Sequence, residues 1–161
     1  MQPNYCYRFT IKSITDGDTI KGHIDLGFGF WVSPPALAST IRLAGIDTPE
    51  SRTRKRPHER ILGKAAKKRL QEIIASAENL PGKRGETKKK IFIQTLKDES
   101  GKFGRTLATL FVNNVDVNQT LIDEGHAREY WGGGKNELGP WTREVDGKWQ
   151  RWTKSGYVPM E

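Results

Sequence analysis

Residues 5–26 read YCYRFTIKSITDGDTIKGHIDL, and this stretch determines how the fold begins. The residues on both sides of Asp16-Gly17 are rich in β-branched and aromatic types and alternate with polar ones, which predicts strands over 5–14 and 19–26. Asp-Gly between two such runs is a hairpin signal. The segment therefore predicts a β-hairpin whose turn carries two carboxylates, those of Asp16 and Asp18.

The sequence after the hairpin predicts one more strand and a helix. Residues 27–35 are apolar in the middle and irregular at both ends, so they continue the strand, form a bulge or form an extended loop. Residues 40–44 predict a third strand, and residues 51–60 a basic loop. Apolar residues then recur at helical spacing, at Leu62, Ala66, Leu70, Ile73 and Ala77. We expect Asn79, Pro81 and Gly82 to end this helix.

The second half of the chain predicts two further strands and a short helix. Residues 83–90 form a second basic loop, and strands follow over 91–95 and 106–112. Asn113-Asn114 is typical of a hairpin turn. Asn118 is the predicted N-cap of a helix over 119–124, which Gly125 would end.

Three strands, a helix, two strands and a short helix follow one another in the order of an OB-fold. We therefore expect a mainly β protein with α-helices: a five-stranded Greek-key barrel with one helix between strands three and four and a short helix after strand five. Residues 1–131 would form this domain. Residues 132–161 are a Gly- and Trp-rich extension, expected to pack on the same domain, although its aromatic residues could also face a partner: Trp141, Trp149, Trp152 and Tyr157.

The charge balance of the chain limits its partners. The 161 residues carry a formal charge of +8, which favours a polyanion, either nucleic acid or an anionic membrane surface, over a neutral partner. A basic protein without such a partner is the alternative. No apolar run approaches the ~20 residues that span a membrane, and the N-terminus does not resemble a signal peptide. With one cysteine, Cys6, we expect a cytoplasmic or intracellular monomer without membrane contact, unless a leader has been removed.

Three short motifs concentrate the residues that could carry chemistry. They are DGDT at 16–19, IRLAGIDTPE at 41–50 and KFGRTLA at 102–108. Together they offer carboxylates for a hard cation, a carboxylate that could activate water, and two guanidinium groups for a phosphate. Such a set is what a calcium-dependent phosphodiesterase needs.

These motifs, with VNxxLIxxGxA at 117–127, resemble the staphylococcal nuclease (thermonuclease) family from Ile11 to Trp131. The resemblance implies that Ca²⁺ is held by Asp18, Asp47 and the main-chain carbonyl of Thr48. Asp16 either contacts these ligands without binding the metal itself or only forms the turn. The second role is an alternative because Asp-Gly is common in turns for backbone reasons.

The same resemblance assigns roles around the phosphate. Glu50 is the implied general base, and Arg42 and Arg105 are the implied phosphate clamps. For contact with the remaining nucleotide, the resemblance implies four substrate-binding residues, of which the last two are alternatives for the base pocket: Lys102, Phe103, Tyr130 and Trp131. His58, in the basic loop, is a further candidate for a substrate contact.

The function expected from the resemblance is a calcium-dependent nuclease. It would cleave DNA and RNA with little sequence preference and leave 3′-phosphate ends. The alternative is a non-catalytic OB-fold module that binds nucleic acid, but such modules usually lose the acidic and arginine positions that this chain keeps. A structural protein with incidental charge is the third possibility.

Overall fold

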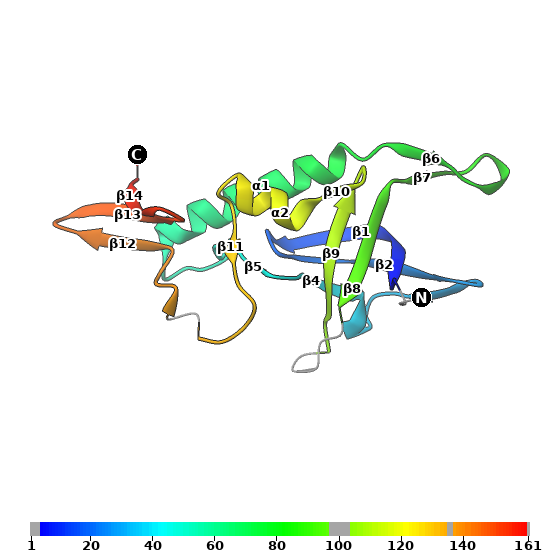
Figure 1. Cartoon of the computed structure of the whole chain (residues 1–161), viewed down its shortest axis with the longest axis horizontal. Coiled ribbons are helices and arrows are strands. Elements are labelled where there is room, and N and C mark those ends of the chain that lie inside the picture. The colour runs from blue at the N-terminus through cyan, green and yellow to red at the C-terminus, as the bar shows by residue number, and fades with distance from the viewer. Residues whose placement is uncertain (1–3, 97–103, 135–136, 161) are drawn as a thin grey trace.

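The computed structural model describes residues 4–96, 104–134 and 137–160, and its centre is a closed five-stranded barrel (Figure 1). The barrel strands are β1 (Cys6–Asp16), β2 (Thr19–Gly27), β4 (Thr40–Leu43), β8 (Ile91–Leu96) and β9 (Thr106–Val112). They pair in the order β1-β8-β9-β4-β2, and the pairing of β1 with β2 closes the ring. All pairs are antiparallel except β4 with β9. The predicted OB-fold barrel is therefore confirmed.

The barrel is filled by the inward-facing residues that the alternating strands predict. Phe9, Ile20, Ile41, Ile93 and Leu110 are all essentially inaccessible to solvent. Leu70 of helix α1 (Pro57–Ala75) and Leu121 of helix α2 (Val117–Asp123) extend the same apolar cluster. The irregular segment after β2 forms a short strand, β3 (Phe30–Val32), which pairs with β2, and a 3₁₀ turn, η1 (Leu37–Ser39).

Helix α1 differs from its prediction at both ends. The basic loop stops at Arg56, because Pro57 occupies the first helical turn, where the missing N–H of proline costs nothing. The helix ends at Ala75 and not at residues 79–82. The predicted loop over 83–90 is also wrong, because strand β6 (Asn79–Pro81) pairs with β7 (Thr87–Lys89) around the 3₁₀ turn η2 (Lys83–Gly85).

Helix α2 is capped by a different residue from the one predicted. The carboxylate of Asp116, in the short strand β10 (Val115–Asp116), accepts a hydrogen bond from the backbone N–H of Gln119 at 3.0 Å. Asn118 lies inside the helix and is buried, so its prediction as the N-cap is wrong. Its side chain bonds to the backbone of Ala44, Ala108 and Leu110 and thereby fastens α2 to the barrel.

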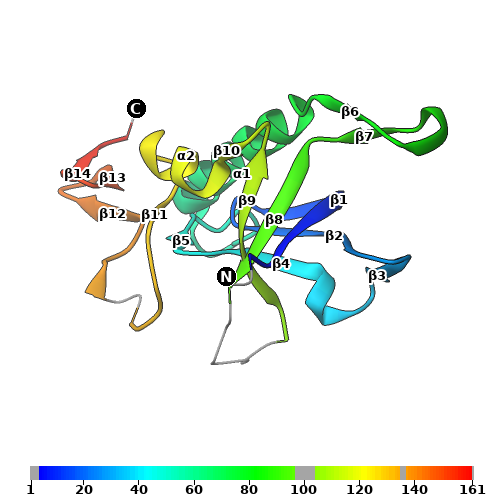
Figure 2. The same ribbon diagram turned by 45° about the vertical axis from the view of Figure 1, so that its right-hand side comes forward.

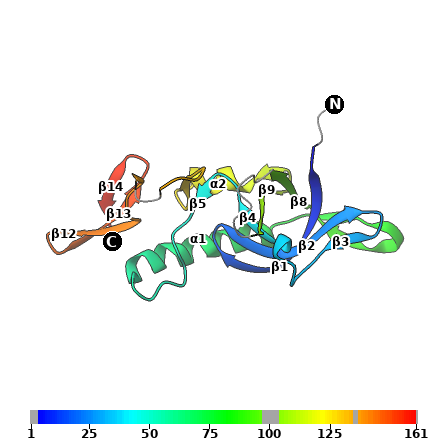
Figure 3. The same ribbon diagram turned by 90° about the horizontal axis from the view of Figure 1, so that it is seen from below.

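Two more small sheets lie beyond the barrel, in addition to the β6–β7 hairpin. Strand β5 (Ile46–Asp47) pairs with β11 (Arg128–Glu129). Strands β12 (Thr142–Val145), β13 (Lys148–Thr153) and β14 (Gly156–Pro159) form an antiparallel sheet. This C-terminal sheet lies beside the first turns of α1, at the opposite end of the molecule from β6 and β7 (Figures 2 and 3). The ring of His58 stacks on Trp149 there, with centroids 3.8 Å apart.

Candidate active site

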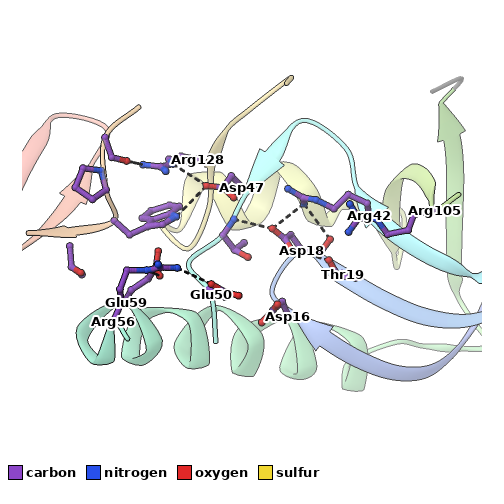
Figure 4. Close-up of a pocket in the computed structure, with 15 residues that line it drawn as sticks. Asp16, Asp18, Thr19, Arg42, Asp47, Glu50, Arg56, Glu59, Arg105 and Arg128 are labelled. Atoms are coloured by element: carbon purple, nitrogen blue, oxygen red, sulfur yellow. Dashed lines mark hydrogen bonds and ion pairs between the residues drawn. The ribbon is translucent and has the colours of Figure 1, made fainter. Parts of the chain in front are cut away.

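A cavity of about 620 Å³ brings together most of the residues singled out in the sequence (Figure 4). Six parts of the chain form its walls: the β1–β2 turn, the segment from β4 through residue 50, Arg56 and Glu59 at the start of α1, Arg105 just before β9, Arg128 of β11, and residues 139–142 before and within β12. The predicted residues that line it are Asp16, Asp18, Arg42, Asp47, Thr48, Glu50 and Arg105.

Asp18 and Arg42 form the first ion pair of this cavity. The pairing of β2 with β4 sets Thr19 opposite Arg42, so Asp18 Oδ2 lies 3.0 Å from Arg42 Nη1. The same carboxylate accepts hydrogen bonds from the Thr48 backbone N–H at 3.1 Å and from the Thr19 hydroxyl at 3.0 Å. Three contacts from the barrel and its following loop therefore fix the orientation of Asp18.

Asp47 forms a second ion pair, with an arginine that the sequence analysis did not identify. The pairing of β5 with β11 sets Asp47 opposite Arg128, and Arg128 Nε donates to Asp47 Oδ2 at 3.2 Å. The indole N–H of Trp141 donates to the same oxygen at 3.2 Å. Asp47, Arg128 and Trp141 are all buried.

Glu50 lies at the solvent-exposed side of the cavity. Its side chain is 54% exposed, and Oε2 lies 2.9 Å from Arg56 Nη2. Arg56 Nε also donates to Glu59 at 2.6 Å, and this hydrogen bond raises the pKa of the Arg56 guanidinium. Gly63 of α1 makes this arrangement possible, because a Cβ there would lie 2.5 Å from the Glu50 carbonyl carbon.

Asp16 does more than form a turn. Its carboxylate accepts hydrogen bonds from both the backbone N–H and the hydroxyl of Ser51, immediately after Glu50. Gly17 beside it packs against α1 and Thr48, since a Cβ at Gly17 would come within 2.9 Å of Ala66. Asp16 therefore fastens the segment that carries Thr48 and Glu50 to the β1–β2 turn.

Of the four predicted substrate-binding residues, the structure describes two. Lys102 and Phe103 lie outside the described residues. Tyr130 and Trp131 line a second cavity of about 450 Å³, and Arg128 lies in the walls of both. The Tyr130 hydroxyl donates to the Gly133 carbonyl, and the Trp131 side chain covers Gly45. His58 stacks on Trp149, so its ring belongs to the contact with the C-terminal sheet.

The oxygen atoms around Thr48 are suited to a hard cation. Two carboxylates, Asp18 and Asp47, line the cavity beside the residue whose carbonyl was predicted as a ligand. Thr48 Oγ1 is buried and has no hydrogen-bond partner within the part of the chain that the structure describes. No three His, Cys, Asp or Glu side chains cluster as metal ligands among the described residues. The donors fit Ca²⁺, which accepts carbonyl and water oxygens beside a small number of carboxylates.

A family profile described as "Staphylococcal nuclease homologue" matches residues 40–139, more than half of the chain. The chain belongs to this family. The staphylococcal nuclease match includes Arg42, Asp47, Thr48, Glu50 and Arg105. It begins after Asp16 and Asp18 and ends before Trp141.

Curated relatives agree with membership of the staphylococcal nuclease family. The uncharacterised protein MJ1439 of Methanocaldococcus jannaschii is 31% identical over 77% of this chain and 59% of its own length. Endonuclease YncB of Bacillus subtilis is 29% identical over 92% of this chain and 63% of its own length. The SPbeta prophage-derived endonuclease YokF, also of Bacillus subtilis, is 29% identical over 92% of this chain and 45% of its own length. The chain thus spans from 45% to 63% of these relatives.

Proposed function

We propose that this chain is a calcium-dependent nuclease that hydrolyses phosphodiester bonds in DNA and RNA with little sequence preference. The observation that carries the proposal is the single cavity in which Asp18, Asp47 and Glu50 meet Arg42 and Arg105. Membership of the staphylococcal nuclease family and the endonuclease names of two relatives support it. The formal charge of +8 is suited to a polyanionic substrate.

The two arginines would bind the scissile phosphate. Arg42 lies on β4 and Arg105 directly precedes β9, the strand that runs parallel to β4. A guanidinium group stays charged and can donate two parallel hydrogen bonds to a phosphoryl group. As negative charge grows on the phosphoryl oxygens in the transition state, these fixed donors would stabilise it.

Glu50 would be the general base. Its exposed carboxylate would take a proton from a water molecule, and the water oxygen would form a new bond to phosphorus. The bond from phosphorus to the 5′ oxygen would break, and that oxygen would take a proton from solvent. This polarity, which leaves a 3′-phosphate, and a preference for single-stranded substrate follow from the family resemblance. Arg56 would hold Glu50 at the edge of the cavity through their ion pair.

Asp18, Asp47 and the Thr48 carbonyl would hold Ca²⁺. When bound, the ion would supply positive charge next to the phosphoryl oxygens and make a bound water more acidic. The role of Asp16 would be to keep the segment carrying Thr48 and Glu50 in place through Ser51. The protein would act as a monomer, because one chain contains the complete residue set.

Digestion of single-stranded DNA with calcium or with chelator tests this proposal. We expect cleavage only with calcium, and a loss of ~10²–10⁴-fold in rate for Glu50→Gln, which removes the base but keeps the shape of the side chain. Glu86→Gln is the matched control, because Glu86 is exposed at the β6–β7 hairpin, at the other end of the molecule. The position of cleavage is tested by end-labelling: products with the expected free 5′-hydroxyl would accept a labelled phosphate from a kinase without further treatment.

The same samples separate catalysis from binding alone. Intact DNA under every metal tried would refute the nuclease. A gel shift without cleavage would then favour the non-catalytic binding module. No shift even at low salt would favour the third possibility, a structural protein that does not bind nucleic acid.

A further inference from the structure

We propose that Arg128 and Trp141 are positioning residues for Asp47, so that the C-terminal extension completes the cation site. This inference rests on the proposed role of Asp47 as a calcium ligand. The family match ends at residue 139, and Trp141 lies outside it. The part of the chain that follows the barrel domain would then help to set the affinity of the site for its metal.

Two hydrogen bonds converge on one oxygen of the Asp47 carboxylate. Arg128 Nε and Trp141 Nε1 each lie 3.2 Å from Oδ2 (Figure 4). The Asp47 and Arg128 side chains are only 5% and 4% exposed, so little water competes for these bonds. Two donors from different directions restrict the rotation of the carboxylate and so determine how it faces the cavity.

The C-terminal segment holds both donors in place. Arg128 Nη1 donates to the Gly139 carbonyl at 3.0 Å, and its guanidinium carbon lies 4.2 Å from the centroid of the Trp141 ring. Trp152 of β13 packs edge-on against Trp141, with centroids 5.5 Å apart, and its backbone N–H donates to the Trp141 carbonyl at 2.8 Å. The C-terminal sheet therefore supports the indole that bonds to Asp47.

The consequence concerns metal affinity. Groups that hydrogen-bond a metal ligand from behind fix its orientation, and their loss typically weakens metal binding ~10–100-fold. Asp18 receives its support from Arg42, Thr19 and Thr48, all within or next to the barrel. The Asp47 carboxylate receives hydrogen bonds from Arg128 and from Trp141, which lies 94 positions further along the chain. The affinity of the cation site should therefore respond to changes in the extension that remove the Trp141 N–H from Asp47.

Calcium binding to Trp141→Phe tests this inference without any activity measurement. The substitution keeps an aromatic ring against Arg128 and removes the N–H that bonds to Asp47. Thermal unfolding across a calcium titration gives the dissociation constant Kd, because a ligand that binds only the native state stabilises it by RT ln(1 + [Ca²⁺]/Kd) and so raises the unfolding midpoint. We expect calcium to bind at least ~10-fold more weakly to the variant. Arg128→Lys, which keeps the charge but not the guanidinium, should weaken binding too.

Trp149→Phe is the matched control. Trp149 lies in the same C-terminal sheet and stacks on His58, so its loss perturbs the sheet without removing a bond to Asp47. Its calcium affinity should equal that of the wild type. Unchanged or tighter binding by both Trp141→Phe and Arg128→Lys, or an equal loss in Trp149→Phe, would overturn the positioning role. A wild-type protein that does not respond to calcium would instead refute the proposed cation site itself.

Discussion

The two aspartate–arginine pairs of the cavity use the same chemistry in different surroundings. Asp18 and Arg42 lie 3.0 Å apart with side chains 12% and 17% exposed, and both come from barrel strands or the turn that joins them. Asp47 and Arg128 lie 3.2 Å apart and are nearly inaccessible, beneath Trp141. The first pair is partly open to solvent, whereas the second, although it lines the same cavity, is nearly closed to water.

We expect this difference in burial to separate an arginine that contacts the substrate from an arginine that supports the site. Arg42 is partly exposed and, besides its contact with Asp18, donates to the Ile46 carbonyl at 2.9 Å, so it would exchange these contacts for bonds to a phosphate. A buried arginine is held by its partner, since breaking a buried ion pair leaves an uncompensated charge in a medium of low dielectric. We therefore expect the Arg42 pair to control the rate of hydrolysis and the Arg128 pair to control stability and the geometry of the cation site.

The largest effect should follow from Arg128→Ala. The substitution removes the arginine that is ion-paired with the buried Asp47 carboxylate, and removal of one partner of such a pair typically costs about 3–5 kcal/mol of unfolding free energy. Urea unfolding of the variant beside the wild type measures this loss. A change below ~1 kcal/mol would show that Asp47 is compensated in another way.

A double variant sharpens this test. Replacement of a whole buried pair by apolar or neutral groups is often close to neutral, because no charge remains buried. Asp47→Asn combined with Arg128→Met should therefore recover most of the stability that Arg128→Ala loses. Nuclease activity should stay absent, since a proposed calcium ligand is gone. Recovery of activity together with stability would refute the role of Asp47.

Arg42→Lys should show the opposite pattern. Lysine keeps a positive charge near Asp18 but cannot donate two parallel hydrogen bonds to a phosphoryl group. Loss of such a donor typically raises the barrier by about 2.7–4 kcal/mol, or 10²–10³-fold in rate. Initial rates on single-stranded DNA and urea unfolding of the same preparation measure both quantities. We expect slow cleavage with nearly unchanged stability; a loss of stability as large as that of Arg128→Ala would erase the distinction between the pairs.

The family resemblance named both members of the first pair as site residues, Asp18 as a calcium ligand and Arg42 as a phosphate clamp, whereas it named only Asp47 of the second pair. The barrel strands alternate clearly, and Asp18 and Arg42 lie in short motifs at the ends of such strands, so their proximity follows from the order of the strands. Strand β11 has two residues, Arg128 and Glu129, which is too short for alternation to be visible. Trp141 follows a glycine-rich stretch, and nothing local indicates that its indole reaches Asp47.

The errors in the fold have a similar origin. Residues 79–89 are polar and basic, and their strands form a hairpin apart from the barrel, so no apolar face reveals them. Asn118 is a common N-cap residue type, but its amide satisfies three backbone groups of the barrel instead. The role of Asn118 was determined by a contact distant in sequence, since Ala44 lies 74 positions before it. No helix in the described part of the chain is long and apolar enough to cross a membrane.

An arginine–carboxylate pair on the surface, outside the cavity walls, should give the smallest effect. Arg69 of α1 donates to both carboxylate oxygens of Glu124, at 2.6 and 2.8 Å. The hydrogen bond from Arg69 lowers the pKa of Glu124 below its ordinary value of 4.5, so the stability that this carboxylate contributes is present above pH 4.5 and is lost as the pH falls through the lowered pKa.

Urea unfolding between pH 7 and pH 3 measures this contribution. Glu124→Gln should be slightly less stable than the wild type at pH 7, and the difference should shrink below pH 4.5 and in high salt, because exposed pairs are screened. His126 titrates in a separate pH range. Burial, helped by the charges of Arg151 and Arg69, lowers the pKa of His126 below 6.5, although Glu124 and Glu72 act in the opposite direction. The unfolded chain therefore binds this proton first, and the free energy of unfolding falls as the pH drops below 6.5. If Glu124→Gln costs as much as Arg128→Ala, burial is not what separates the three pairs. A small, salt-sensitive loss of unfolding free energy in Glu124→Gln would show that an arginine–carboxylate pair contributes more at the cavity because water is excluded there.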